Sequence, residues 1–65
     1  MSEKNIKVFD VWMYRVDWII QSIAGIGYMD IEDWRYRDNF IDGYTPRESA
    51  MEALENAGFP SQLLD

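Results

Sequence analysis

The sequence contains no cysteine and no histidine. Without cysteine there are no disulfides and no thiolate metal sites, so packing alone has to hold the chain together. Without histidine the serines have no imidazole base to activate them, and no nucleophile can be paired with a base. We therefore expect a protein that is not an enzyme and that uses no cofactor and no metal.

Long apolar runs are also missing. No stretch approaches the length of a membrane span, and the N-terminal residues MSEKNIKVFD lack the basic, apolar and small-residue pattern of a signal peptide. Together with the lack of cysteine, this predicts a soluble, cytoplasmic protein that has no membrane partner.

Basic residues are few. The chain has six basic and twelve acidic residues, which give a formal charge of −6. Nucleic-acid phosphates repel such a chain, so we expect no direct nucleic-acid partner. The hydrophobic content of 48% and the aromatic content of 15% are too high for a disordered chain. We expect one domain over residues 1–65 with a marginal core, since a chain of this length buries only about 60% of its surface on folding.

Apolar residues recur at helical spacing in the first third of the chain and predict a helix over residues 5–24. Asp10, Asp17 and Gln21 lie on its opposite, solvent-facing side. The β-branched content is high, so a strand over residues 6–12 remains an alternative. The two glycines of AGIGY supply the end of the helix. The expected core face consists of Val8, Phe9, Trp12, Met13, Val16, Ile19, Ile20 and Ile23.

A second helix is expected over residues 31–42. Asp30 is a favourable N-cap, and Glu32 and Asp33 fall in the first turn, where the helix dipole favours acidic side chains. Gly43 is expected to end this helix. Its apolar residues form two faces, with Ile31, Trp34 and Ile41 on one and Tyr36 and Phe40 on the other.

The clearest helix start lies at Thr45, Pro46 and Glu48, which have the spacing of an N-cap, a first-turn proline and a capping-box glutamate. It predicts a third helix over residues 46–57, closed by Gly58 as a left-handed C-cap. The C-terminal residues SQLLD are expected to add a short turn. The predicted fold class is therefore all-α, a compact three-helix domain.

A helix-turn-helix is an alternative for the second and third helices, because residues 43–45 form a turn of suitable length. The third helix would then be the recognition helix. It carries three glutamates and one arginine, which is the wrong sign for a phosphate-lined groove. DNA binding is therefore the weaker hypothesis.

Acidic and aromatic residues are present in excess and supply the candidate partner-binding surface. A solvated surface that keeps a small protein soluble is one interpretation. The other is an anionic surface that docks on a basic protein, with tryptophan and tyrosine as anchors. The candidate residues are Asp30, Glu32, Asp33, Asp38, Asp42, Trp34, Tyr36, Tyr14 and Trp18.

Three apolar residues of the first helix, Val11, Tyr14 and Trp18, point away from its core face at helical geometry. Another helix of the same chain can cover them, since the long helix of a three-helix bundle contacts two neighbours. Alternatively they form a protein-binding face, most simply the interface of a homodimer. The sequence leaves both possibilities open.

The stretch FIDGYTPRESAMEAL, with its Gly-x-Thr-Pro-x-Glu-x-Ala layout, resembles small phage proteins of unknown function. In size, acidity and lack of cysteine and histidine, the whole chain resembles short acidic inhibitors encoded by phages and mobile elements, anti-CRISPR proteins among them. This resemblance implies inhibition of a host protein by binding to it. Our leading hypothesis is a non-enzymatic interaction protein with a basic, nucleic-acid-handling partner; the alternative is a self-assembling homodimer.

Overall fold

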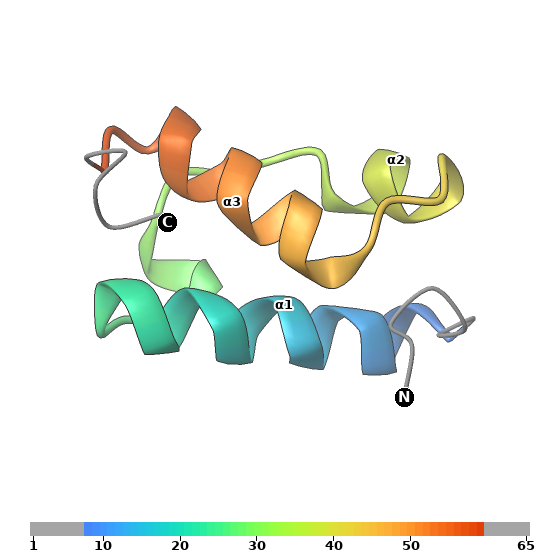
Figure 1. The fold of residues 1–65 in the computed structure, drawn as a ribbon, viewed down its shortest axis with the longest axis horizontal. Helices are drawn as coiled ribbons and strands as arrows, with labels where there is room; N and C mark the ends of the chain where they lie inside the picture. The colour runs from blue at the N-terminus through green and yellow to red at the C-terminus, as the bar shows by residue number, and fades with distance from the viewer. Residues whose placement is uncertain (1–7, 60–65) are drawn as a thin grey trace.

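The computed structural model describes residues 8–59 and contains, within that range, helices and no strand. The elements are α1 (Phe9–Ala24), the short 3-10 helix η2 (Tyr28–Asp30), α2 (Tyr36–Ile41) and α3 (Pro46–Asn56) (Figure 1). This confirms the predicted small all-α fold with three α-helices. The expected C-terminal turn and the first residues of the expected first helix lie outside the described range.

Helix α1 ends as predicted but begins later. Gly25 adopts a left-handed φ of 77°, and its backbone N–H donates to the carbonyl of Gln21. At the other end Val8 is extended and serves as the N-cap, so the helix starts at Phe9 and the alternative of a strand over residues 6–12 is wrong. Val8 was predicted to belong to the core face, but it is 59% exposed. The prediction assumed that Val8 is helical, whereas it precedes the first residue of α1.

The core lies between α1 and α3. The α1 residues Trp12, Val16, Ile19 and Ile20 are buried, as the helical spacing predicted. They face α3, where two of the three core residues are alanines, and small side chains let two helices approach closely. Figure 1 shows the two helices side by side. The α3 members of the core are Ala50, Ala53 and Leu54.

An aromatic cluster closes the core where α2 meets the first half of α1. The rings of Phe9, Trp12 and Phe40 have centroids 5.2 to 6.0 Å apart, in one stacked and two edge-to-face contacts. The indole Nε1 of Trp12 donates a 2.9 Å hydrogen bond to the carbonyl of Tyr44. This bond joins α1 to the turn before α3.

The second helix is shorter than predicted. Residues 31–35 are not helical, and Asp30 ends η2 instead of capping a helix. The chain leaves α1 at its C-terminal end and has to return to its N-terminal end before α2 begins (Figure 1). Five extended residues span about 16 Å, against about 7.5 Å for the same five in a helix, so an extended segment makes this return.

Two side chains of this region also differ from expectation. Ile41 is 70% exposed. It shares no helix face with Ile31 and Trp34, because these two residues precede α2, which begins at Tyr36. Asp17 is partly buried instead of solvent-facing. Its carboxylate accepts hydrogen bonds from the backbone N–H of Tyr28 at 2.8 Å and from the Gln21 side chain at 2.7 Å, and it thereby holds η2 against α1.

Helix α3 starts as the sequence predicted. The Thr45 hydroxyl accepts from the Glu48 backbone N–H at 3.1 Å, and the Glu48 carboxylate accepts from the Thr45 backbone N–H at 2.9 Å. The helix ends at Asn56, one residue before the predicted end. Gly58 has a left-handed φ of 90°, and the N–H of Phe59 donates to the carbonyl of Leu54. This closure brings Phe59 onto the core.

Candidate protein-binding groove

The five predicted acidic site residues do not form one cluster. Asp30, Glu32 and Asp33 lie on η2 and the extended segment, whereas Asp38 and Asp42 belong to α2 and its end. Figure 1 shows η2 and α2 near opposite ends of α1. All five side chains are exposed, and the second group borders a cavity between α2 and α3.

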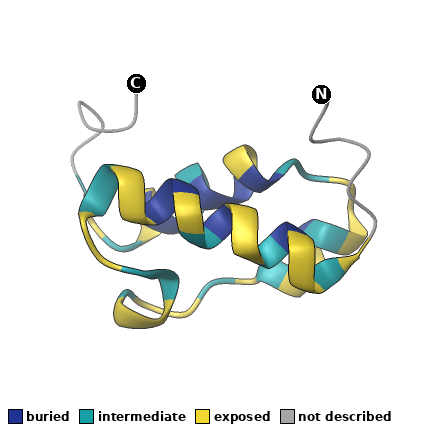
Figure 2. Ribbon diagram, turned by 90° about the horizontal axis from the view of Figure 1, so that it is seen from below, coloured by how far each residue is buried: buried dark blue, intermediate teal, exposed yellow. Residues whose placement is uncertain are grey.

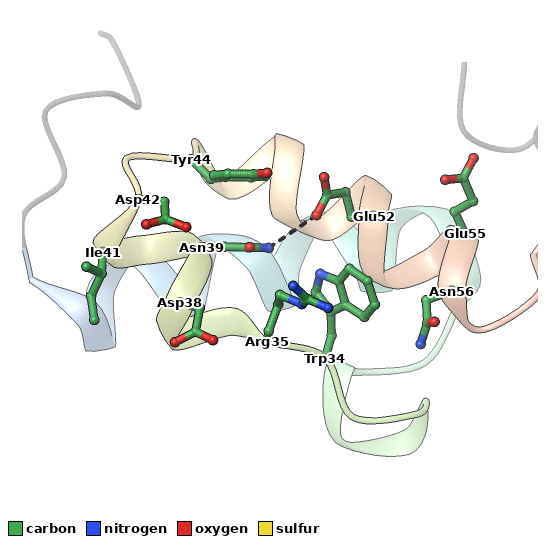
Figure 3. A pocket seen from close by; sticks show the side chains of 10 residues that line it. All are labelled: Trp34, Arg35, Asp38, Asn39, Ile41, Asp42, Tyr44, Glu52, Glu55 and Asn56. Atoms are coloured by element: carbon green, nitrogen blue, oxygen red, sulfur yellow. Dashed lines mark hydrogen bonds between the residues drawn. The ribbon is translucent and has the colours of Figure 1, made fainter.

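That cavity is an open groove of about 600 Å³ between the segment 34–42 and α3. We call it the acidic groove. Figure 3 shows Trp34 and Arg35 in its middle, with α2 on one side and α3 on the other. Its lining consists of Trp34, Arg35, Asp38, Asn39, Ile41, Asp42, Tyr44, Glu52, Glu55 and Asn56.

The charge of the groove comes from two helices. Asp38 and Asp42 approach from α2, and Glu52 and Glu55 approach from α3. Arg35 is the single cation of the lining, and its guanidinium lies 5.3 Å from the ring centroid of Trp34. Four carboxylates against one guanidinium make the groove anionic.

Sequence reasoning missed the contribution of α3. Glu52 and Glu55 are spaced i, i+3 and so share one helix face, but their spacing gives no indication that α2 lies opposite. The signal was therefore present as an acidic stripe, and the pairing of that stripe with Asp38 and Asp42 required the tertiary structure.

Asn39 fixes the floor of the groove. Its side chain is 2% exposed, and its amide nitrogen donates to the hydroxyl of Ser49 at 2.9 Å. The same nitrogen lies 3.5 Å from a carboxylate oxygen of Glu52 (Figure 3). The amide thus links α2 to α3 and orients one of the acidic groups, which places the groove between two connected helices.

Trp34 has an unused hydrogen-bond donor. Its indole nitrogen is buried and has no hydrogen-bond partner within residues 8–59. A buried N–H without an acceptor is costly, and most such groups in proteins are paired. The Trp34 ring lines the groove, but its N–H lies below the surface, so a partner in the groove contacts the ring and not the N–H.

Tyr36, the other aromatic site candidate of this segment, does not line the groove. Its ring packs edge-to-face on Tyr28 with centroids 5.7 Å apart, and its hydroxyl is buried without a partner in the described part of the chain. Burial, with smaller contributions from Tyr28, Asp33 and Asp17, raises the pKa of Tyr36 to about 12. Tyr36 therefore serves the packing of η2 against α2.

Tyr14 and Trp18 lie on a second surface, the outer face of α1. Together with Val11 they form what we call the α1 stripe, and these three side chains are 51 to 70% exposed. Figure 2 shows α1 from outside, with exposed residues repeating along the helix. The other helices do not cover this face, because η2, α2 and α3 all pack elsewhere on α1.

Within residues 8–59, no group of three or more acidic side chains is arranged to hold a metal ion. In the same residues, no helix combines the length and the apolarity needed to cross a membrane. Glu52 and Glu55 of α3 border the acidic groove, and the helix-turn-helix alternative stays a prediction.

Comparison with known proteins connects the chain to bacteriophages. Residues 8–59 match DUF5419, a family of unknown function. The Gene 87 protein of Mycobacterium phage L5 is 44% identical over 48 residues, which cover 74% of this chain and 91% of that protein. The Gene 87 protein of Mycobacterium phage D29 is 44% identical over 48 residues, covering 89% of its length. No solved structure is significantly similar. These matches support the phage origin that the sequence predicted, while the anti-CRISPR-like role stays a prediction.

Proposed function

The chain belongs to the DUF5419 family, and for this member we propose a non-enzymatic role in which the acidic groove binds a basic segment of another protein. The partner supplies lysine or arginine side chains for the carboxylates and a contact for the ring of Trp34. The observation that carries the proposal is the convergence of four carboxylates around a tryptophan ring that lines the same groove.

Electrostatics supports a basic partner. Opposed carboxylates from two helices attract a cationic segment from a distance and set its register on contact. The whole chain adds to this attraction through its charge of −6. A nucleic acid is disfavoured for the same reason.

Trp34 supports a specific contact as well as an electrostatic one. Tryptophan is enriched among residues that dominate binding energy, since it combines a large apolar ring with one donor. The ring face of Trp34 already holds the guanidinium of Arg35 at 5.3 Å, and a cationic side chain of the partner can pack on the ring in the same way. A binding surface with this arrangement selects a peptide segment over a free cation.

Inhibition of a host protein is the purpose of binding that we propose for this phage-related chain. A phage-type inhibitor that occupies the nucleic-acid site of a host protein has to present acidic groups to a basic surface. The acidic groove does so on a scaffold without histidine or cysteine, and this composition favours binding over catalysis. The hypothesis of an inhibitor of a basic, nucleic-acid-handling protein rests on these two points.

The test is an NMR titration of the ¹⁵N-labelled protein with a lysine- and arginine-rich decapeptide. The chain has three tryptophans, and Trp34→Phe identifies the indole signal that belongs to the groove. We expect this signal to shift on peptide addition. The indole signal of Trp12, whose N–H already donates to Tyr44, should stay in place.

A charge-matched pair of variants localises the binding. Asp38→Lys with Asp42→Lys changes the groove, whereas Asp30→Lys with Asp33→Lys makes the same change in charge outside it. Peptide binding should be lost in the first variant and retained, at somewhat lower affinity, in the second. Equal losses in both would show that overall charge governs binding, and the groove proposal would then be wrong.

A further inference from the structure

The outer face of α1 has the residue pattern of a short coiled coil. The domain's own core uses Trp12, Val16, Ile19 and Ile20 of this helix. Those residues occupy the b, c and f positions of a heptad in which Val11 and Trp18 are successive a residues and Tyr14 is the d residue between them. The positions that a partner helix contacts are therefore the exposed ones.

We infer that the α1 stripe is the docking site of a second copy of this chain, whose α1 packs against it in parallel. The charges beside the stripe identify the occupant. Asp10 precedes Val11 at a g position and Arg15 follows Tyr14 at an e position. In parallel two-stranded coiled coils, a g residue lies beside the e residue five positions further along the other helix. Asp10 of each copy thus lies opposite Arg15 of the other, and both pairs are of opposite charge.

The same arrangement disfavours an antiparallel pair. When two helices meet in opposite directions, e residues face e residues and g residues face g residues. Asp10 and Arg15 of the two copies would then lie on different edges of the interface, and neither Asp10–Arg15 pair could form. Of the two directions, the parallel one gives both attractions, so charge complementarity selects both the occupant and its direction.

Trp18 is the main apolar anchor of the pair. Its ring is 56% exposed, and the guanidinium of Arg15 lies 5.7 Å from the ring centroid. A second copy buries the ring against its counterpart while Arg15 stays at the rim, close to the opposing Asp10. A contact with an aromatic centre and charged flanks is the usual anatomy of a protein interface.

This pairing leaves the acidic groove open. The groove lies between the segment 34–42 and α3, and α1 passes behind it in Figure 3. A parallel dimer therefore presents two grooves, one on each copy. The inference does not depend on the proposed function, because the two surfaces share no residue.

Sedimentation equilibrium over the micromolar range tests the pairing on the full chain at moderate salt, which screens the repulsion between two copies of charge −6. We expect a monomer–dimer equilibrium. Arg15→Asp and Asp10→Arg should each raise the dimer Kd about tenfold, because each replaces two attractions by two repulsions. Trp18→Ala should raise it by about 30-fold or more. Circular dichroism confirms that each variant is folded.

The double variant Asp10→Arg with Arg15→Asp is the decisive measurement. It restores opposite charges in the parallel register, so its dimer Kd should return to the wild-type value. A mixture of the two single variants should form the heterodimer. A chain that stays monomeric throughout this range overturns the inference, and so does a dimer whose Kd the double variant fails to restore.

Discussion

Trp12 and Trp18 are the same residue type in the same helix, six positions apart, and their environments are opposite. Trp12 is 1% exposed, contacts the rings of Phe9 and Phe40 and donates a hydrogen bond to Tyr44. Trp18 is 56% exposed, and its ring contact is the guanidinium of Arg15. Six residues correspond to about 600° of helical rotation, which leaves the two side chains about 120° apart around the axis and so on different faces of α1.

The comparison shows that the type of a residue does not by itself determine its structural role in this small chain. Both tryptophans raise the hydrophobic content equally, yet only one contributes to the core. Trp34 is an intermediate case, since its indole nitrogen is buried but has no acceptor within residues 8–59. The three tryptophans thus serve folding, the outer face of α1 and the acidic groove, respectively.

The largest effect expected from this comparison is on folding. Trp12→Ala should lower the free energy of unfolding by about 3 to 5 kcal/mol, because it opens a cavity in the aromatic cluster and removes the bond to Tyr44. A marginal domain of this size should then be largely unfolded. Trp18→Ala, measured under the same conditions at low protein concentration, should change it by less than about 0.5 kcal/mol. Urea denaturation followed by circular dichroism measures both, and similar losses in the two variants would refute the division of α1 into two faces.

The division of α1 is the part of the structure that the sequence predicted best. Periodicity identified the buried residues Trp12, Val16, Ile19 and Ile20 and left Val11, Tyr14 and Trp18 outside. The end of α1 at Gly25 and the start of α3 at Thr45 were also predictable, because a left-handed glycine and a capping box depend on local backbone geometry. Local rules therefore sufficed wherever local interactions decide the conformation.

Residues 31–35 were not predictable in the same way. Asp30, Glu32 and Asp33 have the composition of a helix start, but the chain needs an extended return along α1 at this point. Tertiary geometry overrides helix propensity here. The sequence predicted two of the four carboxylates of the acidic groove, Asp38 and Asp42. It did not predict Glu52 and Glu55 as site residues, because their approach depends on how α2 packs against α3.

A second matched pair extends the comparison to buried polar groups. Asn39 is 2% exposed and bonded to Ser49, while Asn56 is exposed at the edge of the groove. Asn39→Ala should lower the free energy of unfolding by about 1 to 3 kcal/mol, since it removes this bond and leaves the Ser49 hydroxyl buried without that partner. Asn56→Ala should have little effect. Thermal denaturation of both variants measures the difference, and an equally mild Asn39→Ala would show that the amide does not link the helices.

A third pair tests the corrected assignment of α2. Ile20 is fully buried, as predicted, whereas Ile41 is 70% exposed, although it was expected to share an apolar helix face with Ile31 and Trp34. Ile20→Val should cost about 1 kcal/mol, because one buried methylene is lost from a closely packed site. Ile41→Val should lie within about 0.5 kcal/mol of wild type. Chemical denaturation resolves the two, and a cost at Ile41 equal to that at Ile20 would show that the Ile41 side chain is buried.

The smallest effect at neutral pH is expected at Tyr36, whose hydroxyl is buried without a partner in residues 8–59. Tyr36→Phe should be nearly neutral there, because it removes a polar group that makes no hydrogen bond. The difference from wild type should emerge in alkali. Burial raises the pKa of Tyr36 from 10.0 to about 12 in the folded chain, so the unfolded state loses its proton first and the wild type loses stability as the pH rises from 10 to 12. Unfolding free energies measured across that interval should fall more steeply for wild type than for Tyr36→Phe; parallel slopes would mean that the hydroxyl is solvated in the folded protein.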